Sequence, residues 1–364
     1  MAEPRDHVLM TLAIKPRGKL VDLEHIREKV SRDAGREFSG EEVGKLLEEL
    51  VEEGLVGREG EGYALTERGR EHFERRWREV REELNQDYLK VYRAKKYYPV
   101  VAPALLEFCR DRWVSVFRLF TGRAWLQRKV GNRYITIRSL RDLERWLDLH
   151  GIDFIPYIHP RGSDRPDWFV LDLDAGKEVP EGEVRRVVAT TLRVMEEFGL
   201  EPKLKYSGSR GFQLWTRFKP HDLPEGYRPL ELQSGGRERN LFSFYADLIR
   251  FLEYRVSLKL PGLTTCDVAH KERRRGKVLF DPSVMKPMGD VRAPYSMHHR
   301  TGLISMPLEG KELGSFRPEQ ADPERVAERY RERGKEFELR PVEGEEFFGE
   351  ALEWFRESPG GRKE

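Results

Sequence analysis

The chain has few cysteines, no excess of charge of one sign and no long apolar run. Cys109 and Cys266 are the only cysteines among 364 residues, too few for a disulfide framework or a structural zinc site, which predicts a reducing setting. The 66 lysines and arginines nearly balance the 64 aspartates and glutamates, so any nucleic-acid face must be local. No run approaches the roughly 18 apolar residues of a membrane span, and the start lacks a signal-peptide core. We therefore expect a cytoplasmic protein without a membrane partner.

Residues 1–85 predict a separate module with helices at about 7–14, 23–32 and 39–53, followed by a hairpin at 55–66 and a charged helix. Ser39 followed by Glu42 forms a capping box at the start of the third helix. This order resembles a winged helix, which binds DNA through its third helix. That helix is instead mostly acidic, so a protein contact or dimerisation is as good an interpretation as DNA binding. Its charged residues are Glu41, Glu42, Lys45, Glu48 and Glu49.

From residue 86 onward strands and helices alternate, with no internal repeat. The periodicity predicts a helix over 183–198 that Gly199 ends, and strict alternation predicts a strand over 212–218. We expect an α+β catalytic domain over 86–310 and a helical extension over 311–364, with a helix beginning at Asp322 and Pro323.

Three carboxylates lie on or at the end of two predicted apolar strands. Asp172 and Asp174 lie two residues apart, so both leave one face of the strand, about 6.6 Å apart along the backbone. That spacing suits one or two divalent cations. A solvated strand end is the alternative, but the surrounding apolar residues favour a strand buried on both faces. Asp281 ends another apolar strand, and three such carboxylates are what two-metal phosphoryl chemistry requires.

A glycine turn at Ser207 to Gly211 lies between two predicted strands. It would offer backbone N–H groups, hydroxyls and the Arg210 guanidinium to a phosphate, although glycine-serine turns without a ligand are equally common. One crossover helix separates the turn from Asp174, which should return it beside the carboxylates. A basic loop before Asp281 would follow template or primer phosphates or, alternatively, be merely solvated. Its cations are Arg273, Arg274, Arg275 and Lys277.

These motifs, in this order, resemble the polymerase domain of bacterial ligase D over roughly residues 88 to 310. The run from Arg292 to Leu303 is also similar to the archaeal primase small subunit, so the chain resembles the archaeo-eukaryotic primase superfamily. The resemblance implies a primase-like α+β core of mixed sheets flanked by helices, preceded by the winged-helix-like domain. It is carried by Tyr157-Ile158-His159-Pro160, Arg165-Pro166-Asp167, Asp172-Leu173-Asp174, Ser207-Gly208-Ser209-Arg210-Gly211, Asp281 and Ala293-Pro294-Tyr295-Ser296.

The resemblance implies a nucleotidyl transferase that adds NTPs or dNTPs to a 3′-hydroxyl on a DNA primer-template or at broken ends. By resemblance, two Mg²⁺ or Mn²⁺ ions would be held by Asp172, Asp174 and Asp281, without structural zinc. A separate DNA ligase and Ku-like end binders are the implied partners. Trp125 lies near the family's ring under the incoming base, with core packing as the alternative. The nucleotide would be held by His159, Ser207, Ser209, Arg210, Gly211, Gln213, Arg292, Ser296, His298 and Arg300.

The chain departs from the family pattern at two places. Gln213 stands where the family has a histidine. Glutamine cannot become cationic, so a lower rate or a weaker affinity for the nucleotide is expected. The stretch 282–285 lacks the polar residues of the ligase D pattern, which leaves sugar selection open. A catalytically silent nucleic-acid-binding or regulatory paralogue and a replicative primase subunit are the alternatives. The three retained aspartates argue against the first, and the missing zinc knob argues against the second.

Overall fold

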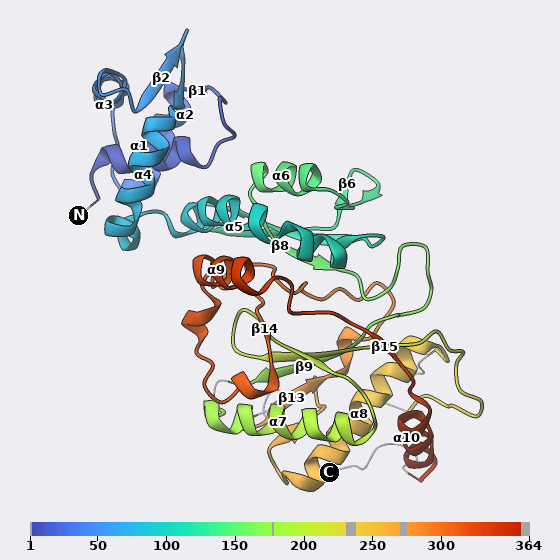
Figure 1. Ribbon diagram of the computed structural model, residues 1–364. Helices are drawn as coiled ribbons and strands as arrows, with labels where there is room; N and C mark the ends of the chain where they lie inside the picture. Colours follow the sequence, from blue (N-terminus) through green and yellow to red (C-terminus); the bar gives the residue numbers. More distant parts are fainter. Residues whose placement is uncertain (1, 177, 231–237, 270–274, 358–364) are drawn as a thin grey trace. The chain divides into compact units, whose positions relative to one another are not determined.

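The computed structural model describes residues 2–176, 178–230, 238–269 and 275–357, and it divides into two compact units (Figure 1). The first unit runs to Pro99 and includes Phe117–Gln127 and Leu140–Ile152. The second unit holds Val100–Val116, Arg128–Ser139 and the chain from Asp153 onward. None of the described helices combines the length and apolarity that crossing a membrane would need.

The beginning of the first unit confirms the predicted order of three helices, a hairpin and a fourth helix. Its three strands form one antiparallel sheet in the order β1-β3-β2. The elements are α1 (Pro4–Ala13), β1 (Val21–Asp22), α2 (Leu23–Ala34), α3 (Gly40–Glu52), β2 (Val56–Glu59), β3 (Gly62–Leu65) and α4 (Glu67–Val80).

Local chemistry explains where α3 begins and which face it buries. The Ser39 hydroxyl accepts a hydrogen bond from the Glu42 N–H at 3.1 Å, and the Glu42 carboxylate accepts one from the Ser39 N–H at 2.7 Å. This is the predicted capping box, which satisfies two N–H groups at the helix start. Val43, Leu47 and Leu50 lie at helical spacing and are buried. The glutamates of α3 therefore remain on its exposed side.

A long helix and a small sheet follow. The sheet has the order β5-β4-β8, and the short strands β6 and β7 form a separate hairpin. The elements are α5 (Gln86–Cys109), β4 (Val114–Phe120), β5 (Arg123–Gln127), β6 (Lys129–Val130), β7 (Arg133–Tyr134), α6 (Leu140–Asp148) and β8 (Gly151–Pro156).

The second unit is built on a seven-stranded mixed sheet. Its main path has the order β12-β13-β9-β11-β10-β14, and β15 pairs with β11. The central strand β9 is antiparallel to both β11 and β13, and the crossover through α7 returns the chain to β10, one strand beyond β11. The elements are β9 (Phe169–Ala175), α7 (Glu181–Glu197), β10 (Lys203–Tyr206), β11 (Phe212–Phe218), α8 (Leu241–Lys259), β12 (Thr264–Thr265), β13 (Val278–Asp281), β14 (Pro307–Leu308), α9 (Pro323–Arg333), β15 (Pro341–Val342) and α10 (Glu345–Glu357).

The two faces of this sheet have different neighbours. On one face, the ring of Phe169 lies 5.6 Å from that of Tyr245 on α8 and 6.2 Å from that of Phe347 on α10. Figure 1 shows α7 and α8 along this side of the sheet. On the other face, Trp215 packs against Phe108. Alternation along β9 directs its aspartates to this second face, away from α8.

The sequence predicted several of these elements closely. The helix expected over 183–198 is α7, and Gly199 follows it with a φ of +68° that favours glycine. The strand expected over 212–218 is β11. Helix α9 begins at Pro323, and the Asp322 side chain caps it.

Candidate active site

Four polar residues from four adjacent strands form one row across the sheet. Lys205 on β10 lies opposite Gln213 on β11, Gln213 lies opposite Asp172 on β9, and Asp172 lies opposite Asp281 on β13. Opposed residues of antiparallel strands share a face, with Cβ atoms about 5 Å apart. Asp174 lies two residues beyond Asp172 and shares that face too. The fold thus places the three aspartates on one face of the sheet.

Asp172 occupies an electrostatically strained position in this row. Burial raises the pKa of Asp172 to about 6. The hydrogen bond with Gln213 acts in the opposite direction on this pKa, whereas the negative charges of Asp281 and Asp174 raise it further. Lys205 contributes a smaller lowering effect. A cation bound among the three carboxylates would remove their mutual repulsion.

The donor set fits a hard divalent cation. Carboxylate oxygens are the ligands that Mg²⁺ and Mn²⁺ prefer. Among the residues that the structure describes, no three His, Cys, Asp or Glu side chains already stand at metal-ligand spacing. Burial raises the pKa of Asp172 most, and the charges of Asp281 and Asp174 raise it further, so a cation here would be balanced by nearby negative charge.

Gln213 is held in one orientation by its own strand. It is buried, and its Oε1 accepts a hydrogen bond from the Trp215 indole N–H at 3.2 Å. An indole N–H can only donate, so this contact assigns the oxygen of the amide to Trp215. The amide nitrogen is then the donor available to Asp172, with which Gln213 is hydrogen-bonded. The glutamine therefore orients the central carboxylate without carrying charge.

Lys205, which the sequence analysis missed, is the fully buried end of the row. Its ammonium group donates to the Ser305 hydroxyl at 2.5 Å and lies 5.3 Å from the centre of the Trp215 ring. Burial lowers the pKa of Lys205 well below its ordinary value. The alternation of polar and apolar residues over 203–206 predicted that Lys205 lies on the polar face of its strand. It could not show that this face, too, is covered by the rest of the protein.

Close packing explains two glycines of the turn at 207–211. Gly208 has a φ of +87°, and a Cβ there would lie 2.9 Å from the Cβ of His298. A Cβ on Gly211 would lie 2.4 Å from the Leu173 carbonyl oxygen and 3.4 Å from the Cα of Asp174. Such distances exclude a larger residue without a backbone shift. The predicted return of the turn beside the carboxylates is confirmed.

The same turn corrects one expectation. The N–H groups of Ser209 and Gly211 are not free, since both donate to the Ser207 hydroxyl at 3.3 and 3.2 Å. Short loops with a hydroxyl at the first position often close on themselves in this way. The side chain of Arg210 is exposed at the tip. Of the anion-binding groups predicted in the turn, the guanidinium is the one most open to a ligand.

A buried ionic cluster lies beneath the turn and was not predicted. Asp153 on β8 is fully buried and accepts two hydrogen bonds from the Arg292 guanidinium, both at 2.8 Å. It also accepts from the His299 N–H at 3.1 Å and contacts the His299 Nδ1 at 2.8 Å. Burial alone would raise the pKa of Asp153, but Arg292 and His299 hold this pKa well below its ordinary value. An aspartate inside the apolar strand 152–155 was the signal for such a cluster.

Two residues expected at the nucleotide belong to this cluster. The third nitrogen of the Arg292 guanidinium, Nη1, donates to the Ser207 carbonyl at 3.2 Å. Arg292 therefore joins Asp153 to the glycine turn. Ser296 is fully buried, and its hydroxyl accepts from the Phe154 N–H at 2.7 Å. Both side chains thus have partners within the protein, and the nucleotide contacts that the resemblance implied for them stay a prediction.

His298 lies in the loop that contacts the glycine turn, and its ring is held by Thr301. Its Nδ1 accepts from the Thr301 N–H at 3.3 Å, so its proton resides on Nε2. Burial, with the charge of Arg292, lowers the pKa of His298 to about 3, so the ring is neutral at neutral pH. The Thr301 hydroxyl donates to the Gly208 carbonyl at 2.5 Å, which joins this loop to the glycine turn. Arg300 beside it is exposed.

His159 lies in an aromatic enclosure. It is 3% exposed, and its Nδ1 lies 3.0 Å from the Pro160 carbonyl, which makes Nδ1 the donor. Its ring meets Trp113 edge-on at 5.8 Å and Phe242 at 5.9 Å. The remaining nitrogen, Nε2, is therefore the one that can accept a hydrogen bond.

The residues predicted to bind nucleic acid lie in different parts of the structure. Trp125 lies on β5 in the first unit and is 66% exposed, so the alternative of core packing is wrong. Arg275 forms an ion pair with Glu178 at 2.5 Å, and Lys277 directly precedes β13. Arg273 and Arg274 lie outside the described residues.

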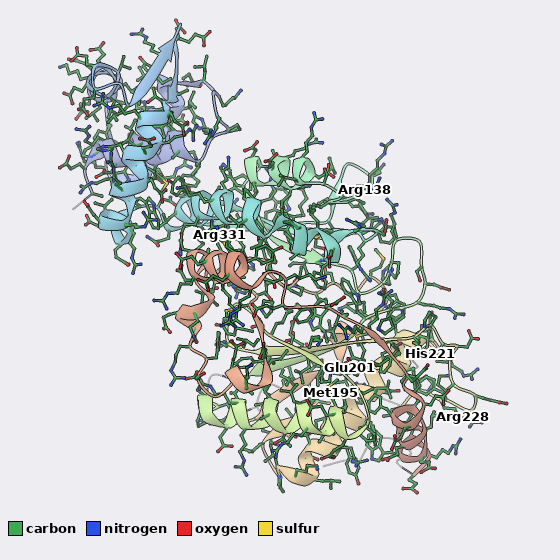
Figure 2. The ribbon with its side chains drawn as sticks, viewed as in Figure 1. Arg138, Met195, Glu201, His221, Arg228 and Arg331 are labelled. Atoms are coloured by element: carbon green, nitrogen blue, oxygen red, sulfur yellow. The ribbon has the colours of Figure 1, made fainter. Side chains whose placement is uncertain are left out.

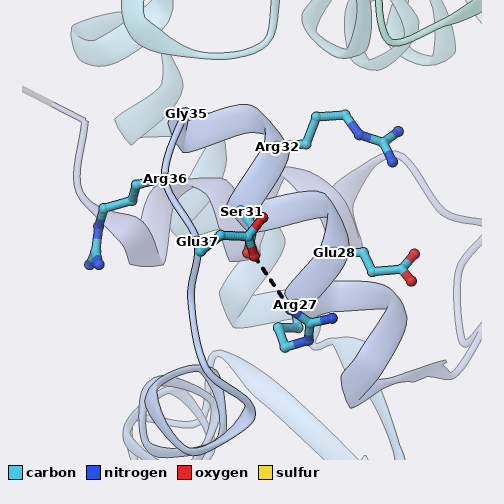
Figure 3. Close-up of a pocket in the computed structure, with 7 residues that line it drawn as sticks. All are labelled: Arg27, Glu28, Ser31, Arg32, Gly35, Arg36 and Glu37. Carbon is cyan, nitrogen blue, oxygen red and sulfur yellow. Dashed lines mark ion pairs between the residues drawn. The ribbon is translucent and has the colours of Figure 1, made fainter.

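Two surface cavities are found away from the aspartates. One, of about 590 Å³, lies in the first unit between α2 and the loop after it, where Arg27 pairs with Glu37 at 3.7 Å (Figure 3). The other, of about 480 Å³, lies in the second unit around Trp168 and the ion pair of Arg112 with Asp167. Acidic and basic side chains alternate in both linings, so neither favours a ligand of one charge.

The mixed α+β architecture is similar to that of a solved ligase D polymerase domain. A family model described as LigD, primase-polymerase domain, matches residues 124–337, more than half of the chain, and the chain belongs to this family. The predicted resemblance is thereby confirmed.

Two relatives define the extent of the likeness. The multifunctional non-homologous end joining protein LigD of Pseudomonas aeruginosa is 29% identical over 184 residues, which cover 50% of this chain and 20% of LigD. The chain thus matches about a fifth of that relative's length. The polymerase domain from Mycobacterium tuberculosis ligase D in complex with DNA superposes with a TM-score of 0.55 at 22% identity, covering 66% of this chain and 88% of that domain. At this identity the superposition shows the α+β fold.

Proposed function

We propose that the chain is a metal-dependent primase-polymerase that transfers nucleotides from NTPs or dNTPs to a 3′-hydroxyl on DNA. The observation that carries this proposal is the placement of three aspartates on one sheet face, beside a glycine turn packed so closely that a Cβ on Gly211 would lie 3.4 Å from the Cα of Asp174. Membership of the LigD primase-polymerase family supports the same reaction. A cytoplasmic role in repair of broken DNA ends is the setting we expect.

Asp172, Asp174 and Asp281 would hold one or two Mg²⁺ or Mn²⁺ ions. When bound, such ions supply electrostatic stabilisation of the charge that develops during phosphoryl transfer. The protein contributes the arrangement of ligands: Gln213 fixes the orientation of the Asp172 carboxylate.

The anionic tail of the nucleotide would be held by groups around the glycine turn. Neutral His298 would donate from Nε2, and the exposed guanidinium groups of Arg210 and Arg300 supply positive charge. His159 would contribute its Nε2 from the aromatic enclosure. We assign Arg292 and Ser296 to the support of the turn instead of to direct binding.

The domain at 1–85 would act as a winged-helix-like module that contacts another protein. Its third helix exposes glutamates, which would repel a phosphate backbone. A separate DNA ligase and Ku-like end binders remain the partners that family membership suggests. The helical segment from 311 onward would pack on the catalytic domain without contributing chemistry.

The function is tested by primer extension and unprimed synthesis with all four NTPs or dNTPs, in Mg²⁺ and in Mn²⁺. We expect incorporation by the full chain and at least a hundredfold loss in Asp172→Ala and Asp281→Ala. A matched control is Asp164→Ala, which removes an exposed aspartate outside the row. Incorporation retained by both row variants would exclude this active site, and no incorporation by the wild type would favour a silent paralogue.

A further inference from the structure

The hairpin formed by β6 and β7 is a basic element in a chain whose charges otherwise balance. The segment 128–139 holds four cations and no carboxylate, whereas the whole chain has a net charge of +2. Residues 128–133 are all exposed. Arg138, the last of the four cations, is labelled in Figure 2. The other three are Arg128, Lys129 and Arg133.

The hairpin is short and its conformation is well specified. Lys129 pairs with Tyr134 and Val130 with Arg133, which leaves a two-residue loop. Gly131 in this loop has a φ of +58°, as the tight turns that fit twisted strands require. Because paired residues share a face, Lys129 and Arg133 project from opposite faces of the hairpin. Cations on both faces of an exposed hairpin suit a phosphate backbone better than a single anion.

Aromatic stacking holds the hairpin against the rest of the second unit, of which it is a part. The Tyr134 ring stacks on Trp113 at 4.6 Å and 29°, and the Lys129 ammonium lies 4.4 Å from the centre of the Tyr134 ring. The main chain adds two bonds, from the Ile135 N–H to the Arg128 carbonyl and from the Val114 N–H to the Ile135 carbonyl. The hairpin is thus fixed at its base while its tip is exposed.

The same stack connects the hairpin to the proposed nucleotide site. Trp113, which supports Tyr134, meets the His159 ring at 5.8 Å, and the Trp113 carbonyl accepts from the Tyr157 N–H at 2.9 Å. One tryptophan therefore contacts both the base of the hairpin and a residue that we place at the triphosphate. A polymerase must hold the primer-template close to the incoming nucleotide, and this hairpin offers the positive charge at such a place.

Arg128 has a carboxylate partner at the base of the hairpin. Its guanidinium lies 3.5 Å from Asp290, which also accepts from the Ser115 hydroxyl at 2.5 Å. This pair fixes the first residue of the hairpin and offsets part of its charge. Lys129 and Arg133, which are exposed and project from opposite faces of the hairpin, are the residues to change in a test.

We propose that the hairpin at 128–134 grips the phosphate backbone of the DNA primer-template through Lys129 and Arg133. The proposal rests on the function proposed above, because it takes DNA as the substrate. Each phosphate contact on a duplex lowers log K by about 0.9 for each unit of log salt. Loss of both contacts should therefore reduce the salt slope by about 2.

The test compares Lys129→Ala/Arg133→Ala with a matched double variant, Arg186→Ala/Arg193→Ala. The control residues are exposed on α7, which lies along the face of the sheet opposite to the aspartates. Binding of a fluorescent primer-template is measured by anisotropy between about 50 and 200 mM salt, which requires no catalysis. We expect weaker binding and the reduced slope in the hairpin variant alone.

Kinetics give the second readout. The hairpin variant should raise KM for primer-template at least fivefold and leave KM for the nucleotide unchanged, a split that general loss of structure would not produce. Asp172→Ala should bind DNA with the full salt slope, so failure of the catalytic assignment and failure of the hairpin assignment are distinguishable. A salt slope equal to that of the control, or equal losses in both double variants, would overturn the proposal.

Discussion

Replacing Asp172 by asparagine should make the metal-free protein more stable while it abolishes nucleotide incorporation. Asparagine has nearly the shape of aspartate and can still accept the hydrogen bond from Gln213. It carries no charge, so it removes the repulsion that Asp172 shares with Asp281 and Asp174. A residue selected for function at the expense of stability should respond in this way.

The magnitude follows from the pKa of Asp172, which is raised from 3.8 to about 6. A difference of about two pKa units corresponds to about 3 kcal/mol. Because the pKa is higher in the folded state, the protonated carboxyl contributes stability fully below about pH 3.8, and this contribution is lost as the pH rises through about 6. We therefore expect Asp172→Asn to raise the free energy of unfolding by about 1–3 kcal/mol at pH 7.5 and to change it little near pH 4.

Urea unfolding of both proteins in EDTA at pH 4, 6 and 7.5 measures this difference. The control is Asp164→Asn, an exposed aspartate whose replacement should stay within about 0.5 kcal/mol at every pH. Addition of Mg²⁺ or Mn²⁺ should stabilise the wild type at pH 7.5, because a ligand that binds only the folded state shifts unfolding by mass action. The same addition should stabilise Asp172→Asn less.

Two results would refute the reasoning. A loss of stability in Asp172→Asn at pH 7.5 would show that the carboxylate is not under electrostatic strain. A gain that is the same at pH 4 and pH 7.5 would show that its cause is not ionisation. Full incorporation by the variant would separately exclude Asp172 from the active site.

Three further changes probe the support of the site and the first domain. Asp153→Asn should cost about 3–5 kcal/mol in urea unfolding, since it leaves the buried charge of Arg292 unpaired, and Asp153→Asn/Arg292→Met should regain part of this loss. Gln213→His should keep at least a tenth of the incorporation rate, whereas Gln213→Leu, without a donor for Asp172, should lose about a hundredfold in kcat. Neutralising the α3 glutamates should leave DNA affinity and its salt slope unchanged, and a large rise in both would contradict a protein-contact role. That variant changes Glu41, Glu42, Glu48 and Glu49 to glutamine.

The strands that carry the aspartates could be predicted from the sequence because their residue patterns follow from the alternation of side chains between the two faces of a strand. Strand β9 is apolar apart from Asp172 and Asp174, and β11 alternates strictly, so both the element type and the shared face follow from the period of two. The crossover through α7 then required the glycine turn to return near the carboxylates. These predictions rest on local geometry, which a sequence specifies well.

The buried charges could not be predicted in the same way. Lys205 and Asp153 are fully buried, but each is separated from its partner by about a hundred residues or more, as in the bond from Lys205 to Ser305. The periodicity of a short segment predicts on which face of a strand a residue lies. It does not predict which distant part of the chain covers that face. Trp125 shows the reverse error, since an aromatic side chain in a strand suggests a core position and this one is 66% exposed.

The neighbours of Gln213 in the sheet explain how a glutamine can stand where the family pattern has a histidine. A neutral donor suffices to orient Asp172, provided that its oxygen and nitrogen cannot exchange places, and the Trp215 indole N–H prevents that exchange. Lys205, next to Gln213 in the row, also lowers the pKa of Asp172. A second cation at position 213 would add to the burial of charge on this face. Because the glutamine carries no charge, the three carboxylates keep their net negative charge for the metal ions that the proposed reaction requires.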